Sequence, residues 1–370
     1  MPFASAFSTL EMSNRVAKIR QKMAEDDVDA LIITNEANVR YLTGFRGEPR
    51  TVLITDESLV LYTSYRTLPW AEKQCSSLVD TIELVVASSP LTEIQKRLKP
   101  ALKIGTDLGI TYRAIQGLQK QFPAHQVEPC AIIEEVRRIK SPAEISLMQQ
   151  SQVLNEEIFR ATLPLITLGM TERVVQGLML AQMASNELVE RYSFEPIVAF
   201  GPNAWEIHHL PDDTPISEEQ MLLLDLGVFH QGYASDMTRT TCLGKATDQM
   251  HEVYEIVKKA QTAAIAAIRP GVTTHEIDRI AREIISEAGY ARGFTHGLGH
   301  SIGLETHDPG LNLSQSTPET ALEKGMVFTV EPGIYLEDGF GVRTEDVVVV
   351  TADGTQRLTR EPLDLIELTF

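Results

Sequence analysis

The chain after residue 140 repeats one sequence pattern, and this repetition restricts the fold more than any other feature. Segments 166–180 and 268–284 each place a glycine-containing turn before a helical pattern. Each is followed by two apolar, strand-like segments that meet in a hairpin. Repeated units of this kind are stable because they stack and bury one continuous core. We therefore expect residues 141–370 to form one domain of two similar α/β halves.

The first hairpin segment, LLLDLGVFHQGYASDMTRTT, carries two aspartates. Asp225 and Asp236 are symmetric about the point between His230 and Gln231. An antiparallel ladder folded at this point would place the two carboxylates opposite each other on one face. Asp225 also interrupts a strongly apolar run, where an unpaired charge is costly.

The second hairpin segment, VFTVEPGIYLEDGFGVRTEDVVVV, follows the same plan. Glu331 and Glu345 are symmetric about Asp338 in a glycine-containing turn, so we expect these two carboxylates to face each other as well. Four carboxylates that converge from two hairpins repel one another unless a counter-charge lies among them. Bound cations would supply that charge; the alternative is that the acids lie on a solvated face and bind nothing.

Three histidines lie close together in the segment THGLGHSIGLETHD. His300 has a glycine-rich setting that lets the backbone approach a crowded site closely. One imidazole and four carboxylates suit manganese, cobalt or zinc in a two-metal arrangement, unlike the thiolate-rich set of a structural zinc. His296 and His307 would flank the metals as proton carriers or oxyanion partners. For each histidine taken alone, the alternative is a surface or core residue.

The part of the chain before the repeat is expected to form a smaller α/β domain. A helical pattern at 10–27 precedes short apolar and β-branched segments that alternate with further helical patterns. Ser141 and Pro142 have the residue types of a helix N-cap and first helical position, so a long helix begins there. The expected class is α/β (α+β), with domains at 1–135 and 141–370.

Charge and cysteine content limit the partners and the compartment. The formal net charge is −18, from 33 basic and 51 acidic residues, which disfavours binding to nucleic acid or to an anionic membrane surface. The three cysteines are far apart and indicate neither a disulfide framework nor a CxxC metal site. The N-terminal segment lacks the pattern of a secretion signal, and no stretch of about 18 apolar residues occurs. A cytoplasmic location is the simplest expectation.

These motifs resemble a known family. The series DLG at Asp225, SDMTRT around Asp236, HGLGHSIGLETHD from His296, EPG at Glu331 and RTED after Val342 is similar to the pita-bread dinuclear metallopeptidases. The similarity is to the branch of Xaa-Pro aminopeptidases and Xaa-Pro dipeptidases (prolidases). NVRYLTGFRG, RRIKSPAEI and GPNAWEIHH extend it along the chain. The resemblance implies a pita-bread catalytic domain, a creatinase/prolidase-type N-terminal domain, and hydrolysis of the bond between an N-terminal residue and a following proline.

The resemblance also implies metal ligands. Asp225 would chelate the first metal, Asp236 and Glu345 would bridge both metals, and His300 and Glu331 would bind the second. Two divalent ions are implied, with manganese expected and cobalt or zinc as alternatives. A hydroxide that bridges the metals would be the nucleophile, and Glu331 would be the base that helps deliver it.

Four further residues match family positions around the metals. His208 and His307 resemble the histidines that stabilise the tetrahedral intermediate, and His296 and Arg343 resemble shuttle or orienting residues. The substrates implied are short proline-containing peptides, and the family suggests a homodimer.

Some positions depart from the family pattern. Ile207 replaces a frequent proline, and Ser301 replaces a frequent glycine. Residues 309–312 lack the arginine with which many prolidases bind the C-terminal carboxylate of a dipeptide. We therefore expect an aminopeptidase that acts on longer Xaa-Pro peptides, with a prolidase as the alternative.

Other functions on the same scaffold are less consistent with the sequence. Metal-free binding proteins and creatinase-like enzymes of this fold lose metal ligands, whereas all five ligand positions are kept here. Methionine aminopeptidases share the ligands but usually lack a large N-terminal domain. A different hydrolase reaction on the pita-bread scaffold stays as an alternative.

Overall fold

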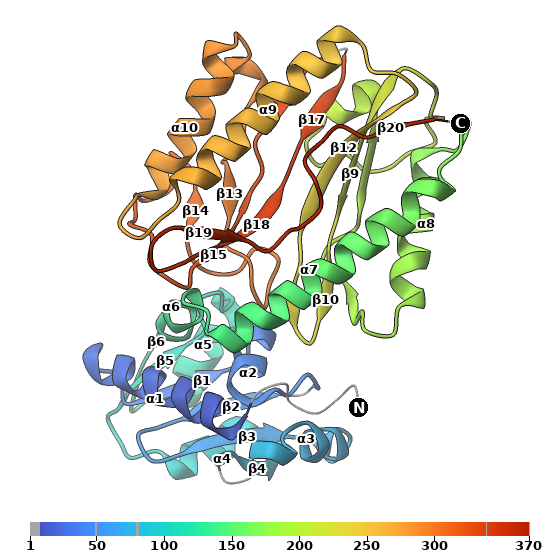
Figure 1. Ribbon diagram of the computed structural model, residues 1–370. Coiled ribbons are helices and arrows are strands. Elements are labelled where there is room, and N and C mark those ends of the chain that lie inside the picture. Colours follow the sequence, from blue (N-terminus) through green and yellow to red (C-terminus); the bar gives the residue numbers. More distant parts are fainter. Residues whose placement is uncertain (1–7, 49, 79–80, 338, 370) are drawn as a thin grey trace. The chain divides into compact units, whose positions relative to one another are not determined.

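The computed structural model describes residues 8–48, 50–78, 81–337 and 339–369. Contacts within the chain divide it into two compact units, Met1–Arg137 and Arg138–Phe370. In Figure 1 the colours of the first unit run from blue to teal, and those of the second from green to red. Among the described helices, none combines the length and apolar character needed to cross a membrane.

The first unit is built around a six-stranded mixed sheet with the order β4-β3-β2-β1-β5-β6. The neighbours β1–β2 and β2–β3 are antiparallel, and the other three pairs are parallel. The strands are β1 (Ala30–Ile33), β2 (Thr51–Ile54), β3 (Leu59–Thr63), β4 (Glu83–Val86), β5 (Lys103–Thr106) and β6 (Gln126–Pro129). The helices are α1 (Thr9–Glu25), α2 (Glu36–Thr43), α3 (Leu68–Gln74), α4 (Pro90–Arg97), α5 (Tyr112–Gln121) and α6 (Ile132–Arg138), the last of which ends at the division. Every residue of β1, β2 and β3 is buried, as expected for strands covered on both faces.

In the described part of the second unit there are four long helices, one four-stranded sheet, two three-stranded sheets and two two-stranded sheets. The helices are α7 (Pro142–Thr162), α8 (Glu172–Ser185), α9 (Asp248–Ala267) and α10 (Thr274–Glu287). Its strands are β7 (Arg191–Tyr192), β8 (Ile197–Phe200), β9 (Gln220–Leu226), β10 (Val228–His230), β11 (Tyr233–Ala234), β12 (Met237–Leu243), β13 (Gly299–His300), β14 (Asn312–Leu313), β15 (Val327–Val330), β16 (Gly333–Tyr335), β17 (Gly341–Arg343), β18 (Asp346–Val350), β19 (Thr355–Arg357) and β20 (Glu367–Leu368). Helix α7 begins at Pro142 with Ser141 as its N-cap, where the sequence predicted a helix start.

The two halves of this unit have the same local construction. Gly169 and Gly271 both adopt positive φ, at 85° and 88°, directly before the helices α8 and α10. The N–H of Gly169 donates to the carbonyl of Ile216, and that of Gly271 donates to the carbonyl of Leu322, at 2.9 Å in each case. The predicted α/β architecture of two similar halves is therefore confirmed.

Each half of the second unit has its own hydrophobic core. In the first half, α7 and α8 pack against the sheet β20-β12-β9-β8. In the second half, α9 and α10 pack against strands that include β15 and β18 of the sheet β15-β18-β19. Figure 1 shows the long helices α7 and α9 on either side of the strands. The strand ends that carry the acidic residues are thereby fixed on two rigid layers.

The second hairpin has the predicted register. β15 pairs with β18 and β16 pairs with β17 in one continuous antiparallel alignment, which places Glu331 opposite Glu345. Asp338, which the sequence placed at the centre of the turn, lies outside the described residues.

The register of the first hairpin differs from the prediction by two residues. Asp225 pairs with Thr238 and not with Asp236. The chain turns at Gln231 and Gly232, which adopt positive φ of 47° and 93°, one residue later than expected. A two-residue hairpin loop of type I′ needs positive φ at both central positions, and glycine accommodates this without steric cost. A shift of two residues preserves the alternation of side chains, so Asp236 still lies on the same face as Asp225.

Candidate active site

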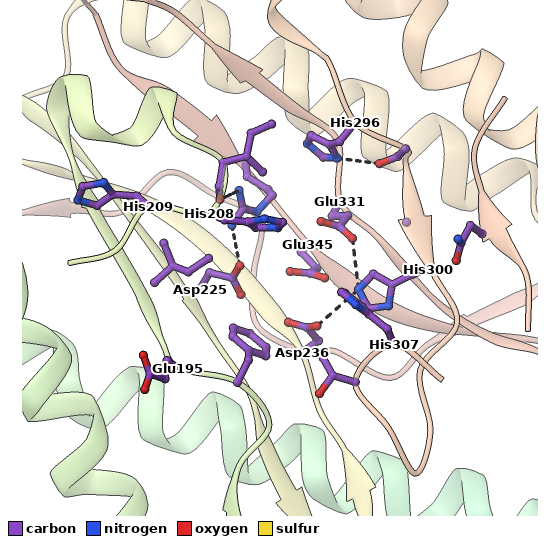
Figure 2. A pocket seen from close by; sticks show the side chains of 18 of the residues that line it. Glu195, His208, His209, Asp225, Asp236, His296, His300, His307, Glu331 and Glu345 are labelled. Atoms are coloured by element: carbon purple, nitrogen blue, oxygen red, sulfur yellow. Dashed lines mark hydrogen bonds and ion pairs between the residues drawn. The ribbon is translucent and has the colours of Figure 1, made fainter. Parts of the chain in front are cut away.

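One cavity in the second unit brings together all the residues that the sequence singled out as catalytic or metal-binding. Its volume is about 670 Å³. The candidates that line it are His208, Asp225, Asp236, His296, His300, His307, Glu331, Arg343 and Glu345. Figure 2 shows the four carboxylates and His300 at the centre of the group, with the other histidines around them.

Asp225 and Asp236 reach this cavity from the first hairpin. Asp225 lies near the end of β9, and Asp236 lies immediately before β12. The Oδ2 atom of Asp225 accepts a hydrogen bond from Nη2 of Arg343 at 2.6 Å. Its Oδ1 atom is buried and has no hydrogen-bond partner among the described residues. A buried carboxylate oxygen without a partner is costly, so Asp225 is suited to a bound cation.

Glu331 and Glu345 enter from the second hairpin. Glu331 follows β15, and its Oε1 accepts a hydrogen bond from Oγ1 of Thr329 at 3.1 Å. Glu345 precedes β18, and its Oε2 accepts a hydrogen bond from Oγ1 of Thr238 at 2.7 Å. The backbone N–H of Glu345 also donates to the carbonyl of Thr238 at 3.0 Å. Because Thr238 belongs to β12, these bonds join the two halves at the carboxylate cluster.

His300, in β13, presents one ring nitrogen to the carboxylates. Its Nδ1 lies 3.1 Å from the carbonyl oxygen of Ser301, which can only accept, so Nδ1 carries the ring proton. Nε2 lies 3.5 Å from Oε1 of Glu331 and 3.7 Å from Oδ2 of Asp236. Burial lowers the pKa of His300, which favours the neutral ring. A neutral nitrogen that faces carboxylates has the arrangement of a metal ligand.

The charge balance of the cavity also fits bound cations. Burial and the neighbouring carboxylates hold the pKa values of Asp236 and Glu345 well above their ordinary range. Burial raises the pKa of Glu331 to about 7, against the opposing effect of Arg343. Arg343 is the only lysine or arginine among the described residues that line the cavity. One guanidinium cannot balance four carboxylates, and a set of oxygen and imidazole donors suits divalent metal ions.

A metal would have close ligand atoms in this cluster. One ligand atom each from Asp236, His300 and Glu345 lie within 4.8 Å of one another. Asp225 and Glu331 extend this set, since the first has a free buried oxygen and the second lies close to His300. Three of the five predicted ligands therefore have atoms close enough to share one ion, and the other two line the same cavity.

Arg343, Tyr335 and His296 form a chain of hydrogen bonds beside the carboxylates. Nη1 of Arg343 donates to the hydroxyl oxygen of Tyr335 at 3.0 Å, and this hydroxyl lies 2.9 Å from Nε2 of His296. Nδ1 of His296 lies 2.7 Å from the carbonyl oxygen of Gly297 and carries the ring proton, so Nε2 accepts from Tyr335. Burial and then Arg343 lower the pKa of His296 to about 4, and burial raises the pKa of Tyr335 to about 12. The rings of His296 and Tyr335 are therefore both uncharged near neutral pH.

His208 and His307 lie at the solvent-facing side of the cavity, and both side chains are exposed. His208 belongs to residues 200–212, which comprise the last residue of β8 and the first part of the connection to β9; we call this segment the histidine loop. The ring of His307 meets the ring of His300 edge-on, with centroids 4.2 Å apart and an interplanar angle of 78°. Partial burial and the neighbouring imidazole of His300 lower the pKa of His307 to about 4.

Sequence reasoning did not single out Tyr335, Thr238 or Glu172 near this site. Tyr335 and Thr238 stand within the quoted segments, close in sequence to acidic residues, but nothing local marks them as contacts of Arg343 and Glu345. Glu172 holds the histidine loop from a distant helix. Only the folded arrangement identifies these three residues.

Comparisons with known proteins agree with this geometry. The family described as metallopeptidase family M24 matches residues 146–352, and the creatinase/prolidase N-terminal domain matches residues 15–139. The Xaa-Pro dipeptidase of Pyrococcus horikoshii is 34% identical over 359 residues, which cover 96% of this chain and 99% of that protein.

Solved structures of similar proteins cover nearly the whole chain. The Xaa-Pro dipeptidase from Bacillus anthracis has a TM-score of 0.89 at 31% identity and covers 96% of this chain and 100% of that one. The X-Pro aminopeptidase from Thermotoga maritima has a TM-score of 0.85 at 29% identity and covers 94% of this chain and 100% of that one. The similarity therefore includes both units.

Proposed function

Because the chain belongs to metallopeptidase family M24, we propose that it hydrolyses the peptide bond between an N-terminal residue and a following proline. The observation that carries this proposal is the convergence of five ligand-type side chains and four further histidines among the described residues on one cavity. The relatives named Xaa-Pro dipeptidase and X-Pro aminopeptidase support the substrate class.

Divalent metal ions complete the site in this proposal. Asp225, Asp236, His300, Glu331 and Glu345 would hold them. When bound, two such ions lower the pKa of a water molecule and polarise the carbonyl of the scissile bond. We propose manganese first, with cobalt or zinc as alternatives, because oxygen-rich sites accept several divalent ions.

The protein groups around the metals have complementary tasks. Glu331, with a pKa raised to about 7, is suited to accept and return a proton at neutral pH. His208 and His307 are exposed at the cavity and would donate hydrogen bonds to the oxygen that gains charge during attack. Arg343 and His296, joined through Tyr335, would keep Asp225 and the neighbouring wall in place.

The chemistry of proline explains why such a site suits this bond. The amide nitrogen of proline has no hydrogen, so an enzyme cannot recognise it through an N–H donor. Metals and histidines act on the carbonyl side and do not need that hydrogen. The apolar side chains that line the cavity offer a surface for the pyrrolidine ring; they are Phe194, Ile197, Ile207, Leu210 and Pro211.

We favour an aminopeptidase over a strict dipeptidase. A dipeptide places a free carboxylate directly after proline, and a specific site needs a cation for it. Arg343 is the only lysine or arginine on the described cavity wall, and its Nη2 is already bonded to Asp225 at 2.6 Å. Residues 309–312 supply no arginine, as the sequence indicates. Longer peptides lack a charge at this position and therefore suit the cavity better.

The test compares Ala-Pro with Ala-Pro-Ala. Metal-stripped protein is reloaded with manganese, with zinc or with cobalt, and Asp236→Ala serves as the control. Cleavage of the first bond of the tripeptide, lost in the control, supports the aminopeptidase. Cleavage of the dipeptide alone makes the protein a prolidase. If neither peptide is cleaved while metal still binds, the proposed substrate class is wrong.

The proposal also covers the oligomeric state and the cellular location of the protein. We propose a homodimer, which light scattering on the purified chain tests directly. We also propose a cytoplasmic location, and the three cysteines support it because all are free, two are buried and one is partly buried.

A further inference from the structure

Glu172 is a buried carboxylate outside the cluster of predicted metal ligands, and its side chain accepts hydrogen bonds from the histidine loop. It is the first residue of α8 and is 0% exposed. Its Oε1 accepts from the N–H of Phe200 at 2.7 Å and from Nδ2 of Asn203 at 3.0 Å. Its Oε2 lies 2.7 Å from Nε2 of His209 and accepts from the N–H of Asp212 at 3.0 Å. One side chain thus fixes both ends and the middle of the loop.

Among these partners, His209 is held by two carboxylates. Its Nε2 faces Glu172 and its Nδ1 lies 3.1 Å from Oε2 of Glu206. Carboxylates only accept, so both ring nitrogens carry protons and the ring is an imidazolium. Burial would lower the pKa of His209, but the bonds to Glu206 and Glu172 outweigh it and raise the pKa. Glu172, His209 and Asp212 lie close enough to hold a metal, but both ring nitrogens are already engaged.

This contact places the neighbouring His208. In Figure 2 the two histidines point in opposite directions, His208 toward the carboxylates and His209 away from them. On the other side, the carbonyl of Ile207 accepts a hydrogen bond from Nη1 of Arg343 at 3.4 Å. The backbone is therefore held immediately before and after His208, while the His208 side chain is exposed at the cavity.

The second half holds its own histidine segment in a related way. Asp278, buried in α10, accepts from the N–H of Leu298 at 3.1 Å and forms an ion pair with Arg282. Arg282 donates through Nη1 to the carbonyl of Phe294 at 3.1 Å and through Nη2 to the carbonyl of His296. The helices α8 and α10 are equivalent in the two halves. Each thus uses a buried carboxylate to fix the segment that carries a cavity histidine.

We propose that Glu172 and His209 are positioning residues that hold the histidine loop so that His208 faces the substrate. His209 lines the cavity, but its ring nitrogens are bonded to Glu172 and Glu206, so neither residue is expected to touch the reacting atoms. The inference rests on the proposed function, because the position of His208 affects turnover only if the cavity is catalytic.

The first test is a double-mutant cycle in the manganese-loaded, full-length enzyme with Ala-Pro-Ala as substrate. Glu172→Gln keeps the size of the side chain but turns an amide donor toward N–H groups. We expect kcat to fall about tenfold or more, because small displacements of a catalytic group are costly. In a His208→Ala background the same change should lower kcat less than about twofold, because the group being positioned is gone. Equal factors in both backgrounds, or no effect in either, would overturn the proposal.

Asp213→Asn is the matched control. Asp213 directly follows the histidine loop and forms an ion pair with Arg173 of the same helix at 3.1 Å, but the two side chains are 82% and 62% exposed. Exposed pairs contribute little, so kcat should stay within about twofold. A fall in kcat as large as that of Glu172→Gln would mean that the effect is not specific to the buried contact of Glu172, because an exposed contact with the same helix would then affect turnover equally.

A second variant pair separates positioning from folding. His209→Gln retains an amide N–H that can reach Glu172, whereas His209→Ala does not. We expect His209→Gln to recover most of the kcat lost in His209→Ala, while both variants keep the metal content of the wild type. Equal kcat in the two variants would overturn the role of this hydrogen bond.

Hydrogen exchange gives a readout that needs no substrate. In Glu172→Gln the amides of residues 200–212 should exchange faster. The N–H groups of Phe200 and Asp212 bond different oxygens of Glu172, and the amide keeps only one oxygen, so one of these two N–H groups loses its acceptor. Metal content should not change. Unaltered exchange in this loop would overturn the positioning role. If the wild type cleaves no Xaa-Pro peptide but the loop loses protection, the proposed function fails and the positioning role stands.

Discussion

Replacing Arg343 with methionine should strongly destabilise the metal-free protein. Arg343 is 2% exposed, and its guanidinium donates to Asp225, Tyr335 and Thr238. Methionine keeps an unbranched apolar stem of similar reach and removes the charge and all donors. Asp225 would then have a buried carboxylate with no partner on either oxygen, because Oδ1 has none already.

The size of the effect follows from the burial of this pair. Removing one partner of a buried ion pair costs about 3–5 kcal/mol. For a unit of this size, one kcal/mol shifts the melting temperature by roughly 2–4 °C, so the loss should be about 6–20 °C. Divalent ions bound beside Asp225 would supply the missing positive charge. In the metal-loaded protein the same substitution should therefore cost less than about half as much.

Scanning calorimetry of the transition of the second unit, with chelator and with manganese, measures both values. Arg279→Met is the control, because Arg279 and Glu283 form a surface pair with side chains 56% and 53% exposed. Its cost should stay below about 1 kcal/mol. An equal loss for Arg343→Met in the two metal states would refute the idea that Asp225 faces a metal. A loss below about 1 kcal/mol without metal would refute the role of Arg343 as counter-charge.

Three further outcomes follow from the same site. Burial raises the pKa of Glu331 to about 7, so metal binding at pH 6 should release protons, and fewer protons as the pH rises past 7. The melting temperature of the metal-free protein should fall over the same pH range, because the folded state binds more protons than the unfolded state. A metal-binding enthalpy that does not depend on the buffer in calorimetry would contradict this. Glu345→Gln removes one of several like charges, so it should raise the melting temperature of the metal-free protein by a few degrees. Metal binding, measured by titration, should be lost. A lower melting temperature would count against repulsion among the four carboxylates. Gly299→Ala would drive a Cβ into the carbonyl of Thr329 and should lower the free energy of unfolding by more than about 3 kcal/mol, measured by thermal unfolding. Gly177→Ala is the control, because its Cβ meets open space and the change should be neutral or stabilising. Similar free energies of unfolding for the two variants would show that β13 can shift freely.

Several features could be predicted from the sequence because they depend on residues close together in the chain. The start of α7 at Pro142 follows from the hydrogen bonds of an N-cap, which span a few residues. The facing of Glu331 and Glu345 follows from hairpin symmetry. The candidate ligands were also recognised from local motifs, and all of them line one cavity.

Tertiary structure was needed for the features that depend on contacts between distant residues or on competition between alternative turns. The first hairpin turns at Gln231 and Gly232, and the two-residue shift depends on which pair of residues adopts positive φ. The pairing of Arg343 with Asp225 spans 118 positions. Sequence carries no signal for such a contact, because it arises from how two sheets meet.

The sequence by itself therefore determined the two-half architecture and the chemical identity of the cavity residues, since periodicity and residue type are local properties. Tertiary structure decided which atoms are paired, which carboxylate oxygen is left free, and how Glu172 fixes the loop that carries His208. These properties depend on distances between segments that only packing brings together.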